Sequence, residues 1–314
     1  MRKYALSEHW AVKSVAEAQA ISVERTFRLR TAEKLALLFF SYVIVAALIA
    51  RLSARERLTL VGLNLIAVSL LLALSSLGRE TRGRFFEKVR DWLPCLLILL
   101  AYRESGLFLT PDPTHRLDHL FVRWDWAVLK HRWVVGVLSL ASPWLQHYLE
   151  ICYFLCYPLV PLGLGSLSIA LQYGDLGRRS AGEVIDHFWT AVLSALFFCY
   201  LIFPLFPLTP PRILFHDFPG PKVDPIFRMM NSWILGQYSV QACIFPSGHV
   251  AGVTATALAV RRYLPRVGAV LTVAALSVAA ATVYGRYHYA ADAVAGALVG
   301  IAAVLISNRV HPRE

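Results

Sequence analysis

Apolar stretches close to twenty residues long recur along most of the chain, and no other feature constrains the fold as strongly. A helix of about 20 apolar residues is long enough to cross the hydrocarbon core of a bilayer. The mean hydropathy is +0.54, and only 16% of the residues are charged. A membrane barrel would instead show short strands of alternating hydrophobicity. The sequence therefore predicts an all-α, polytopic membrane helix bundle and excludes a soluble globular enzyme.

We expect about eight transmembrane helices, of which the sixth is short and is predicted to begin inside the membrane. No internal repeat or flexible linker divides the apolar part, so one membrane domain over residues 35–308 is the simplest organisation. The expected crossings are residues 35–50, 58–77, 92–109, 148–171, 188–208, 249–263, 267–284 and 289–307.

Basic residues outnumber acidic ones, 31 to 20, and their distribution indicates a topology. With the amino terminus inside, the cytoplasmic segments hold 19 of the Lys and Arg residues and the outer segments hold 12. The positive-inside rule therefore places both termini in the cytoplasm, with a plasma or inner membrane as the expected location. No nucleic-acid motif accompanies the positive charge, so no nucleic-acid partner is expected. The oligomeric state stays open.

Residues 1–34 are polar and lack the apolar core of a signal peptide, so we expect a cytoplasmic arm. The motifs described below lie in residues 184–308, the expected catalytic part. Four of the five cysteines lie in apolar stretches, and Cys243 stands alone in a loop. No disulfide framework is expected.

Residues 117–128 carry apolar side chains at helical spacing and predict an amphipathic helix at the membrane interface. Its function would be that of a collar that gathers lipid over a site. An ordinary interfacial anchor that uses Trp124 and Trp126 explains the pattern equally well. The apolar positions are Leu117, Leu120, Phe121, Trp124 and Val128, whereas Asp118, Arg123 and Asp125 face elsewhere.

Polar residues gather in three segments of the last third, at residues 207–212, 245–249 and 284–292. Each segment lies at the end of an expected crossing. Because the fifth and sixth crossings flank one outer loop and the seventh and eighth flank another, all three segments fall on the outer face. Three polar clusters on one side of a membrane predict a site for a charged headgroup.

The second segment reads Phe245-Pro246-Ser247-Gly248-His249. Ser247 is suited to cap a helix, and Gly248 allows close backbone approach. The free N–H groups of a helix amino terminus form a cradle for phosphate. A plain helix cap explains this short string as well.

In the third segment His288 and Asp292 are four residues apart and share one face of a helix. The carboxylate can then hold one ring N–H of the imidazole, which makes the other ring nitrogen a good nucleophile. A polar pair that satisfies itself in the bilayer is the alternative. Arg212 and Arg286 are candidate phosphate ligands, or else side chains that snorkel to the interface.

Pro-Ser-Gly-His, followed by His-x-x-x-Asp with the second histidine 39 residues after the first, resembles the type 2 phosphatidic acid phosphatase superfamily. The Tyr-x-x-Tyr-His-Tyr-x-x-Asp form and the Pro-Pro-Arg upstream are most similar to the branch that contains fungal inositol phosphorylceramide synthase. The resemblance covers about residues 184–308.

The resemblance implies a six-helix core and a phosphohistidine mechanism without metal or cofactor. It gives His288 the role of nucleophile, Asp292 that of its orienting group, and His249 that of general acid and base. The phosphoryl oxygens would be held by Arg212, Ser247 and Gly248, with Arg286 as a further candidate. The implied partners are a lipid phosphate or phospholipid substrate and the bilayer itself.

The chain departs from the phosphatase pattern at two places. Leu205 stands where phosphatases carry Lys, and Ala281-Thr282 stands in place of Ser-Arg. Arg286 is the candidate replacement for the missing guanidinium. These departures favour the transferase branch over simple phosphatases.

Three functions stay open at this stage. The first is an enzyme that cleaves or transfers a phosphoryl or phospho-headgroup at the outer face, by hydrolysis or by transfer to an alcohol. The second is a lipid or solute transporter, indicated by Glu150 within a crossing, although a carboxylate hydrogen-bonded near Tyr148 or Tyr153 explains that residue too. The third is a structural subunit with a decayed site. The loop 215–238 would be a solvated lid over the site.

Overall fold

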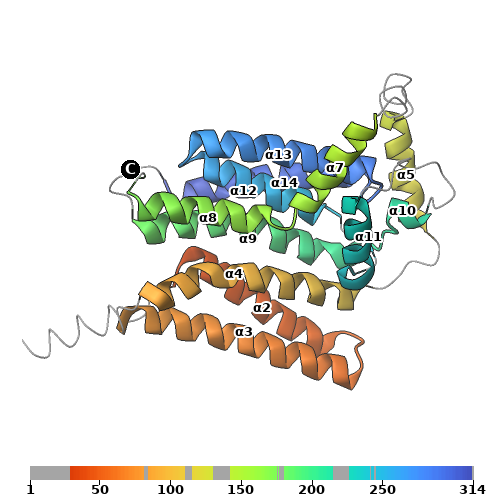
Figure 1. Cartoon of the computed structure of the whole chain (residues 1–314). Coiled ribbons are helices and arrows are strands. Elements are labelled where there is room, and N and C mark those ends of the chain that lie inside the picture. Colours follow the sequence, from red (N-terminus) through yellow and green to blue (C-terminus); the bar gives the residue numbers. More distant parts are fainter. Residues whose placement is uncertain are drawn as a thin grey trace, which may run out of the picture. The chain divides into compact units, whose positions relative to one another are not determined.

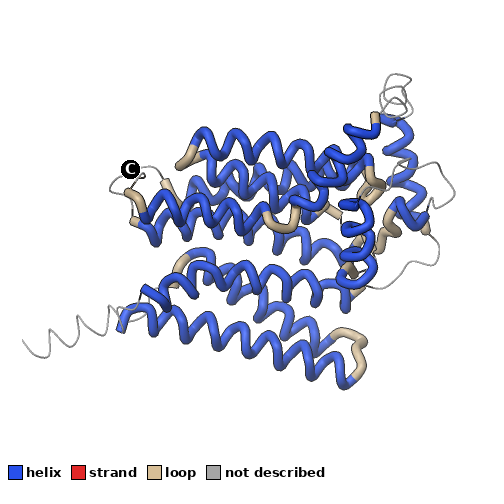
Figure 2. Tube along the Cα trace, viewed as in Figure 1, coloured by secondary structure: helices blue, strands red, loops and turns tan. Residues whose placement is uncertain are grey.

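The computed structural model describes residues 29–80, 84–109, 115–129, 142–174, 176, 180–214, 226–240, 242–243 and 245–312. These residues form helices joined by loops, with no strand among them, as Figure 2 shows. The all-helical fold is confirmed. Residues 1–28, which are most of the expected cytoplasmic arm, lie outside the described residues. The side chain of Val128 is not described either.

The chain divides into two compact units, with the boundary between Leu93 and Pro94. The first unit holds α2 (Thr31–Ile49), α3 (Ala54–Glu80) and the start of α4 (Arg84–Ser105). Pro94 lies inside α4, where it cannot donate a helical hydrogen bond. In the first unit Arg90 holds the buried Glu33 with two hydrogen bonds, and these join the starts of α2 and α4.

The second unit is built around α12 (Gly248–Arg261), which packs against α8 (Leu159–Gln172), α9 (Ala181–Ile202), α13 (Pro265–Tyr284) and α14 (Ala290–Val310). Figure 1 shows these helices side by side. Small residues occupy α12 throughout, and the helix is buried on nearly every face. The remaining elements are η1 (Gly106–Phe108), α5 (Arg116–Leu129), α7 (Pro143–Leu155), η2 (Phe203–Leu205), α10 (Pro211–Leu214) and α11 (Ile226–Tyr238).

Two glycines on α14 set the approach of α14 to α12. A Cβ on Gly296 would lie 2.5 Å from the carbonyl oxygen of Ser247, and one on Gly300 would lie 2.7 Å from that of Ala251. Small residues at such positions let membrane helices approach closely. The amino-terminal ends of both helices, which carry the predicted site residues, are thereby held together.

Among the helices of the described residues, five are long and apolar enough to cross a membrane, namely α2, α3 to Ser76, α9 with η2, α13 and α14. The pair α7 and α8, bent by 67° at its break, counts as a sixth candidate. The two other expected crossings are helical but fail on length or charge. In α4 charged residues lie near both ends, and α12 has 14 residues, about 21 Å of rise. Because α12 is surrounded by helices, it does not need to match the bilayer.

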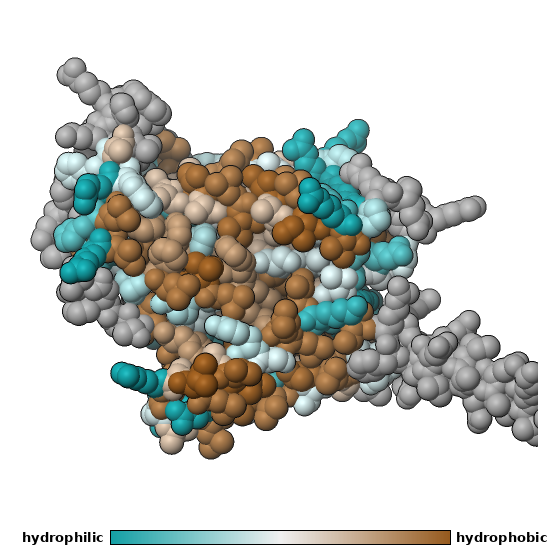
Figure 3. Space-filling model, turned by 180° about the vertical axis from the view of Figure 1, so that it is seen from behind, coloured by the Kyte–Doolittle hydropathy of each residue, from teal (hydrophilic) through white to brown (hydrophobic). Residues whose placement is uncertain are grey.

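The outward faces of these helices are apolar. Figure 3 shows one side of the molecule, mostly brown over its described surface. Large apolar side chains are exposed on the spans, where a water-soluble protein would bury them. The chain is an integral membrane protein. The exposed side chains include Val270, Val273 and Leu276 on α13 and Val294, Leu298 and Leu305 on α14.

Candidate active site

Backbone hydrogen bonds bring the three polar segments of the sequence together. Arg212 N–H donates to the carbonyl of Arg286 at 2.9 Å, and Cys243 N–H donates to that of Leu208 at 2.9 Å. Ser247 N–H donates to the carbonyl of Asp292 at 3.1 Å. The predicted convergence of the three segments at one end of the helices is therefore observed.

The α5 helix is also fixed to these loops. Asp118 accepts a hydrogen bond from Thr209 N–H at 2.8 Å, and Asp125 accepts one from Ala290 N–H at 2.9 Å. Phe121 is buried against Phe245 and Tyr289. The two acidic side chains, expected to face away from the apolar positions of the helix, contact the loops of the candidate site. Trp124 and Trp126 stay exposed, as an interfacial anchor requires.

Ser247 caps α12, since its hydroxyl oxygen accepts from Val250 N–H at 3.4 Å. Ser247 and Gly248 are buried, and His249 follows in the first turn with part of its surface open. The structure thus shows the helix cap. Contacts of these residues with phosphate remain a prediction.

The two histidines and Asp292 form a connected row. His288 Nδ1 lies 3.3 Å from Asp292 Oδ2, and His288 Nε2 lies 3.3 Å from His249 Nδ1. Asp292 is fully buried, and its Oδ2 also accepts from Tyr289 N–H at 3.1 Å. In the tautomer with its proton on Nδ1, His288 donates to this carboxylate, and its Nε2 faces His249.

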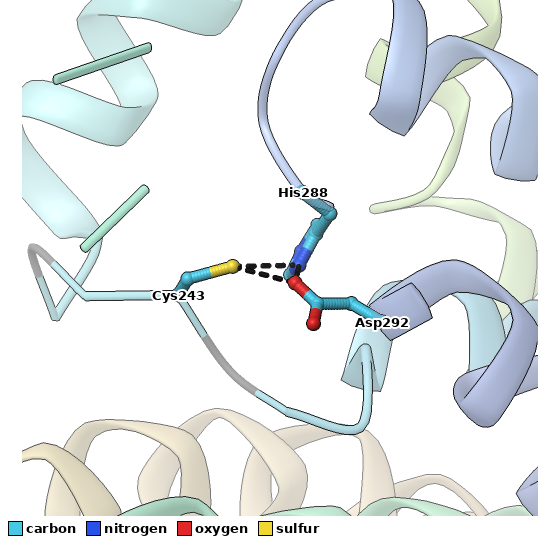
Figure 4. Close-up of side chains that lie close together, drawn as sticks. All are labelled: Cys243, His288 and Asp292. Carbon is cyan, nitrogen blue, oxygen red and sulfur yellow. Dashed lines mark hydrogen bonds and ion pairs between the residues drawn. The ribbon is translucent and has the colours of Figure 1, made fainter. Parts of the chain in front are cut away.

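Sequence reasoning missed Cys243. Its Sγ lies 2.8 Å from Asp292 Oδ2 and 3.3 Å from His288 Nδ1, as Figure 4 shows. We call Cys243, His288 and Asp292 the histidine cluster. The one available signal was the place of Cys243 four residues before Ser247, in the loop that leads to the motif. Spacing alone could not show that this loop folds back onto Asp292.

The surroundings of Cys243 keep it protonated. Burial raises the pKa of the thiol well above its ordinary value, and the negative charge of Asp292 raises it further, while the charge of Arg212 acts in the opposite direction. Cys243 is thus a thiol that donates to the carboxylate.

Arg286 adopts an unusual backbone conformation with a φ of 59°, in the left-handed region. This turn ends α13 and lets the N–H groups of Tyr287 and His288 both donate to the carbonyl of Thr282. Burial lowers the pKa of Arg286, and the nearby positive charge of Arg228 lowers it further.

A second buried cluster surrounds Glu150, which is 2% exposed. Its carboxylate accepts from Arg228 Nη1 at 2.7 Å, from Asn231 Nδ2 at 3.0 Å and from the Tyr287 hydroxyl at 2.7 Å. We call these four residues the glutamate cluster. It joins α7 and α11 to the residue before His288. The hydrogen-bonded interpretation of Glu150 therefore holds, with partners other than the expected Tyr148 and Tyr153.

The described part of the predicted lid is likewise docked. Arg228 and Asn231 belong to α11 and contact Glu150, so this part of the 215–238 loop is not a solvated segment. The other polar residues of that loop, His216, Asp217, Lys222 and Asp224, lie outside the described residues.

Aromatic rings form one side of the site. Tyr153 stacks on Tyr287 with ring centroids 3.8 Å apart, and it lies 5.7 Å from His249. Tyr157 meets His249 edge-on at 5.9 Å. These contacts fix the ring of His249 from the side of α7.

The two departures from the phosphatase pattern have different surroundings. Leu205 is exposed, whereas Ala281 and Thr282 are buried. The fully buried Thr282 lies against the His288 loop, so a guanidinium at that position would have no room. The predicted phosphate ligands lie at other positions.

Comparison with known proteins agrees with the geometry. Residues 214–314 match the sequence model of the PAP2 superfamily. A segment of 70 residues, 22% of the chain, is 41% identical to a PA-phosphatase related-family protein of Dictyostelium discoideum. The match spans 13% of that relative's length. No solved structure matches.

The carboxyl-terminal part of the chain, with its Pro-Ser-Gly-His and His-x-x-x-Asp segments, is similar to the PAP2 superfamily, and both matches support the expected type 2 phosphatidic acid phosphatase superfamily. The expected superfamily is therefore confirmed. The resemblance to the inositol phosphorylceramide synthase branch stays a prediction.

Proposed function

We propose that this protein is an integral membrane enzyme that cleaves or transfers a phosphoryl or phospho-headgroup on a lipid, through a phosphohistidine formed on His288. One observation carries the proposal. His288 has its Nδ1 directed at Asp292 and its Nε2 directed at His249, each at 3.3 Å. A nucleophile, its orienting carboxylate and a second imidazole for proton transfer are thus in a row.

In the first step Nε2 of His288 attacks phosphorus, and the bond from phosphorus to the leaving oxygen breaks. His249, protonated at the start, donates its proton to that oxygen. Asp292 stabilises the imidazolium that forms on His288. Because His249 Nδ1 and His288 Nε2 are 3.3 Å apart, these two nitrogens must separate for a phosphoryl group to lie between them.

In the second step His249 removes a proton from water or from an alcohol, and the oxygen attacks phosphorus. The phosphorus–nitrogen bond breaks, and both histidines return to their starting states. Water gives hydrolysis and a lipid alcohol gives headgroup transfer. The absence of Arg at position 282 favours transfer, as it did from the sequence.

The phosphoryl oxygens carry negative charge that the site must balance. The backbones of Arg212 and Arg286 are joined by a hydrogen bond. Guanidinium groups form charge-assisted hydrogen bonds to phosphate, and Arg228 is already paired with Glu150. We assign Arg212 and Arg286 to phosphate binding, together with the α12 amino terminus at Ser247 and Gly248.

The membrane arrangement completes the proposal. Both termini lie in the cytoplasm, and the site opens at the outer face of a plasma or inner membrane. The α5 helix, anchored to the site by Asp118 and Asp125, then lies where lipid substrate approaches.

The test is release of phosphate from lipid phosphates and diphosphates by the detergent-purified protein with a chelator present. We expect turnover by the wild type and a loss of about 10³-fold or more in His288→Ala. His147→Ala, which changes a histidine on α7 away from the site, is the matched control. If hydrolysis is absent, lipid alcohols are added as acceptors. Near-normal turnover by His288→Ala rejects the mechanism.

A bell-shaped pH dependence of turnover is expected as well, because the two histidines must start in opposite protonation states.

A further inference from the structure

The three side chains of the histidine cluster bring a sulfur, a nitrogen and an oxygen atom close together, and each of these atoms can bind a metal ion. Cys243 Sγ, His288 Nδ1 and Asp292 Oδ2 all lie within 4.8 Å of one another, and all three residues are buried. Around a tetrahedral zinc ion the corresponding separations are about 3.6 Å for the pairs that include sulfur and about 3.4 Å for the nitrogen–oxygen pair. The observed separations are 2.8 Å for the sulfur–oxygen pair and 3.3 Å for the two pairs that include the nitrogen. The nitrogen–oxygen pair therefore fits, whereas the sulfur must move away from the oxygen by about 0.8 Å and from the nitrogen by about 0.3 Å.

The charge of the site favours a cation. Asp292 is fully buried, and the groups that contact its Oδ2 are a thiol, a backbone N–H and an imidazole rather than a guanidinium or an ammonium group. Its second oxygen, Oδ1, is buried and has no hydrogen-bond partner in the described part of the chain. A divalent ion bound by one thiolate and one carboxylate gives a complex without net charge, which burial tolerates far better than a lone anion.

We propose that the histidine cluster is a zinc site that inhibits the enzyme. Thiolate, imidazole and carboxylate together are ligands that suit Zn²⁺ rather than Mg²⁺ or Ca²⁺. The inhibition rests on the proposed function of His288, whereas the binding of zinc does not. Three protein ligands leave a fourth position for water or for a phosphate oxygen.

The proton balance explains why zinc inhibits. Before binding, Cys243 carries a proton on sulfur, and neutral His288 carries one on Nδ1. When zinc binds, the thiol proton leaves to solvent, and the imidazole proton moves from Nδ1 to Nε2. The lone pair on Nε2, the proposed nucleophile, is then lost. Asp292 at the same time coordinates zinc and no longer orients the imidazole.

The binding test uses Co²⁺ as a spectroscopic substitute for Zn²⁺ on metal-free protein in detergent. We expect one ion per chain, with the absorption band of a thiolate–cobalt bond, and displacement of that band by Zn²⁺. Cys243→Ser and Cys243→Ala should lose the band and bind zinc at least about tenfold more weakly. Cys199→Ser, which changes another buried thiol of the same unit, should keep it. A wild type without the band, or a band that survives in both Cys243 variants, overturns the proposal.

The inhibition test measures turnover with and without Zn²⁺, each protein compared with its own zinc-free rate. Zinc should inhibit the wild type and Cys199→Ser, and at least about tenfold more zinc should be needed for either Cys243 variant. Equal inhibition of all four proteins overturns the inhibitory role. If no protein turns over any substrate, the proposed function fails, and the cobalt band still decides whether the site binds metal.

Discussion

The two buried clusters are joined at one peptide bond, between Tyr287 and His288, yet they differ in how their carboxylates are balanced. Glu150 has the guanidinium of Arg228 within 2.7 Å. Asp292 has a thiol, a backbone N–H and an imidazole instead. A buried carboxylate paired with Arg is neutralised in place and is suited to fix structure. A buried carboxylate beside an imidazole can stabilise a charge that develops on that imidazole, which is what catalysis needs.

The largest effect that separates the clusters is expected from Asp292→Asn. The variant keeps the shape of the side chain but removes the charge that stabilises the His288 imidazolium, so turnover should fall by about 10² to 10⁴-fold. Thermal unfolding in detergent should change little by comparison. Turnover and unfolding temperature are measured on the same preparations. A variant that keeps full turnover would remove Asp292 from the catalytic row.

Glu150→Gln should show the opposite pattern. It leaves Arg228 with no carboxylate in a mostly buried site, which costs about 3 to 5 kcal/mol of stability. The unfolding temperature should therefore drop, and any remaining folded enzyme should keep its pH profile. The double variant Glu150→Gln with Arg228→Gln should recover much of the loss, because no buried charge is then left unpaired.

Tyr287→Phe is the matched control for that pair. It removes a single hydrogen bond to Glu150 and leaves the ring stacked on Tyr153, so a loss of about 1 kcal/mol is expected. If Glu150→Gln is no more harmful than Tyr287→Phe, the ion pair does not fix the structure, and the contrast between the clusters fails.

The smallest effect concerns the α5 anchor. Burial raises the pKa of Asp125 from 3.8 to about 6, against the backbone N–H groups of Ala290 and Ala291, which lower it. The folded state then holds a proton that the unfolded state has lost, so the stability from Asp125 falls as the pH rises from 3.8 through about 6. Asp125→Asn cannot ionise. As the pH rises from 3.8 to about 6, the unfolding temperature of Asp125→Asn should rise relative to that of the wild type. If the difference between the two unfolding temperatures does not vary with pH, the raised pKa of Asp125 is contradicted.

Much of the fold follows from local sequence. The crossings at α2, α3, α9, α13 and α14 were predictable, because a long apolar run has no other stable state in a bilayer. The expected total of about eight crossings includes two helices that do not pass as membrane spans by their own length and composition. Residues 92–109 and 249–263 form helices, but charges at the ends of α4 and the 14 residues of α12 keep both below the length of a free-standing span. How many neighbours cover a helix cannot be read from its own residues.

The candidate site divides in the same way. His288 pairs with Asp292 as predicted, but the expected shared helix face is wrong, because His288 lies in the loop before α14 and only Asp292 is on the helix. The cap at Ser247 follows from residue type. Cys243 and the partners of Glu150 could not be found, since Cys243 is 45 residues from His288 and Arg228 is 78 residues from Glu150. No periodic pattern links positions so far apart.

The sequence by itself determined that this chain is a helical membrane protein, and its motifs indicated a phosphohistidine site at the ends of two helices. The length of an apolar run and the spacing of residues along a helix are local properties, because they depend only on neighbours in the sequence. The tertiary structure alone decided which carboxylate receives an arginine and which receives a thiol. Those partners come from distant loops, and Gly296 and Gly300 let α12 and α14 pack closely enough for the loops to meet.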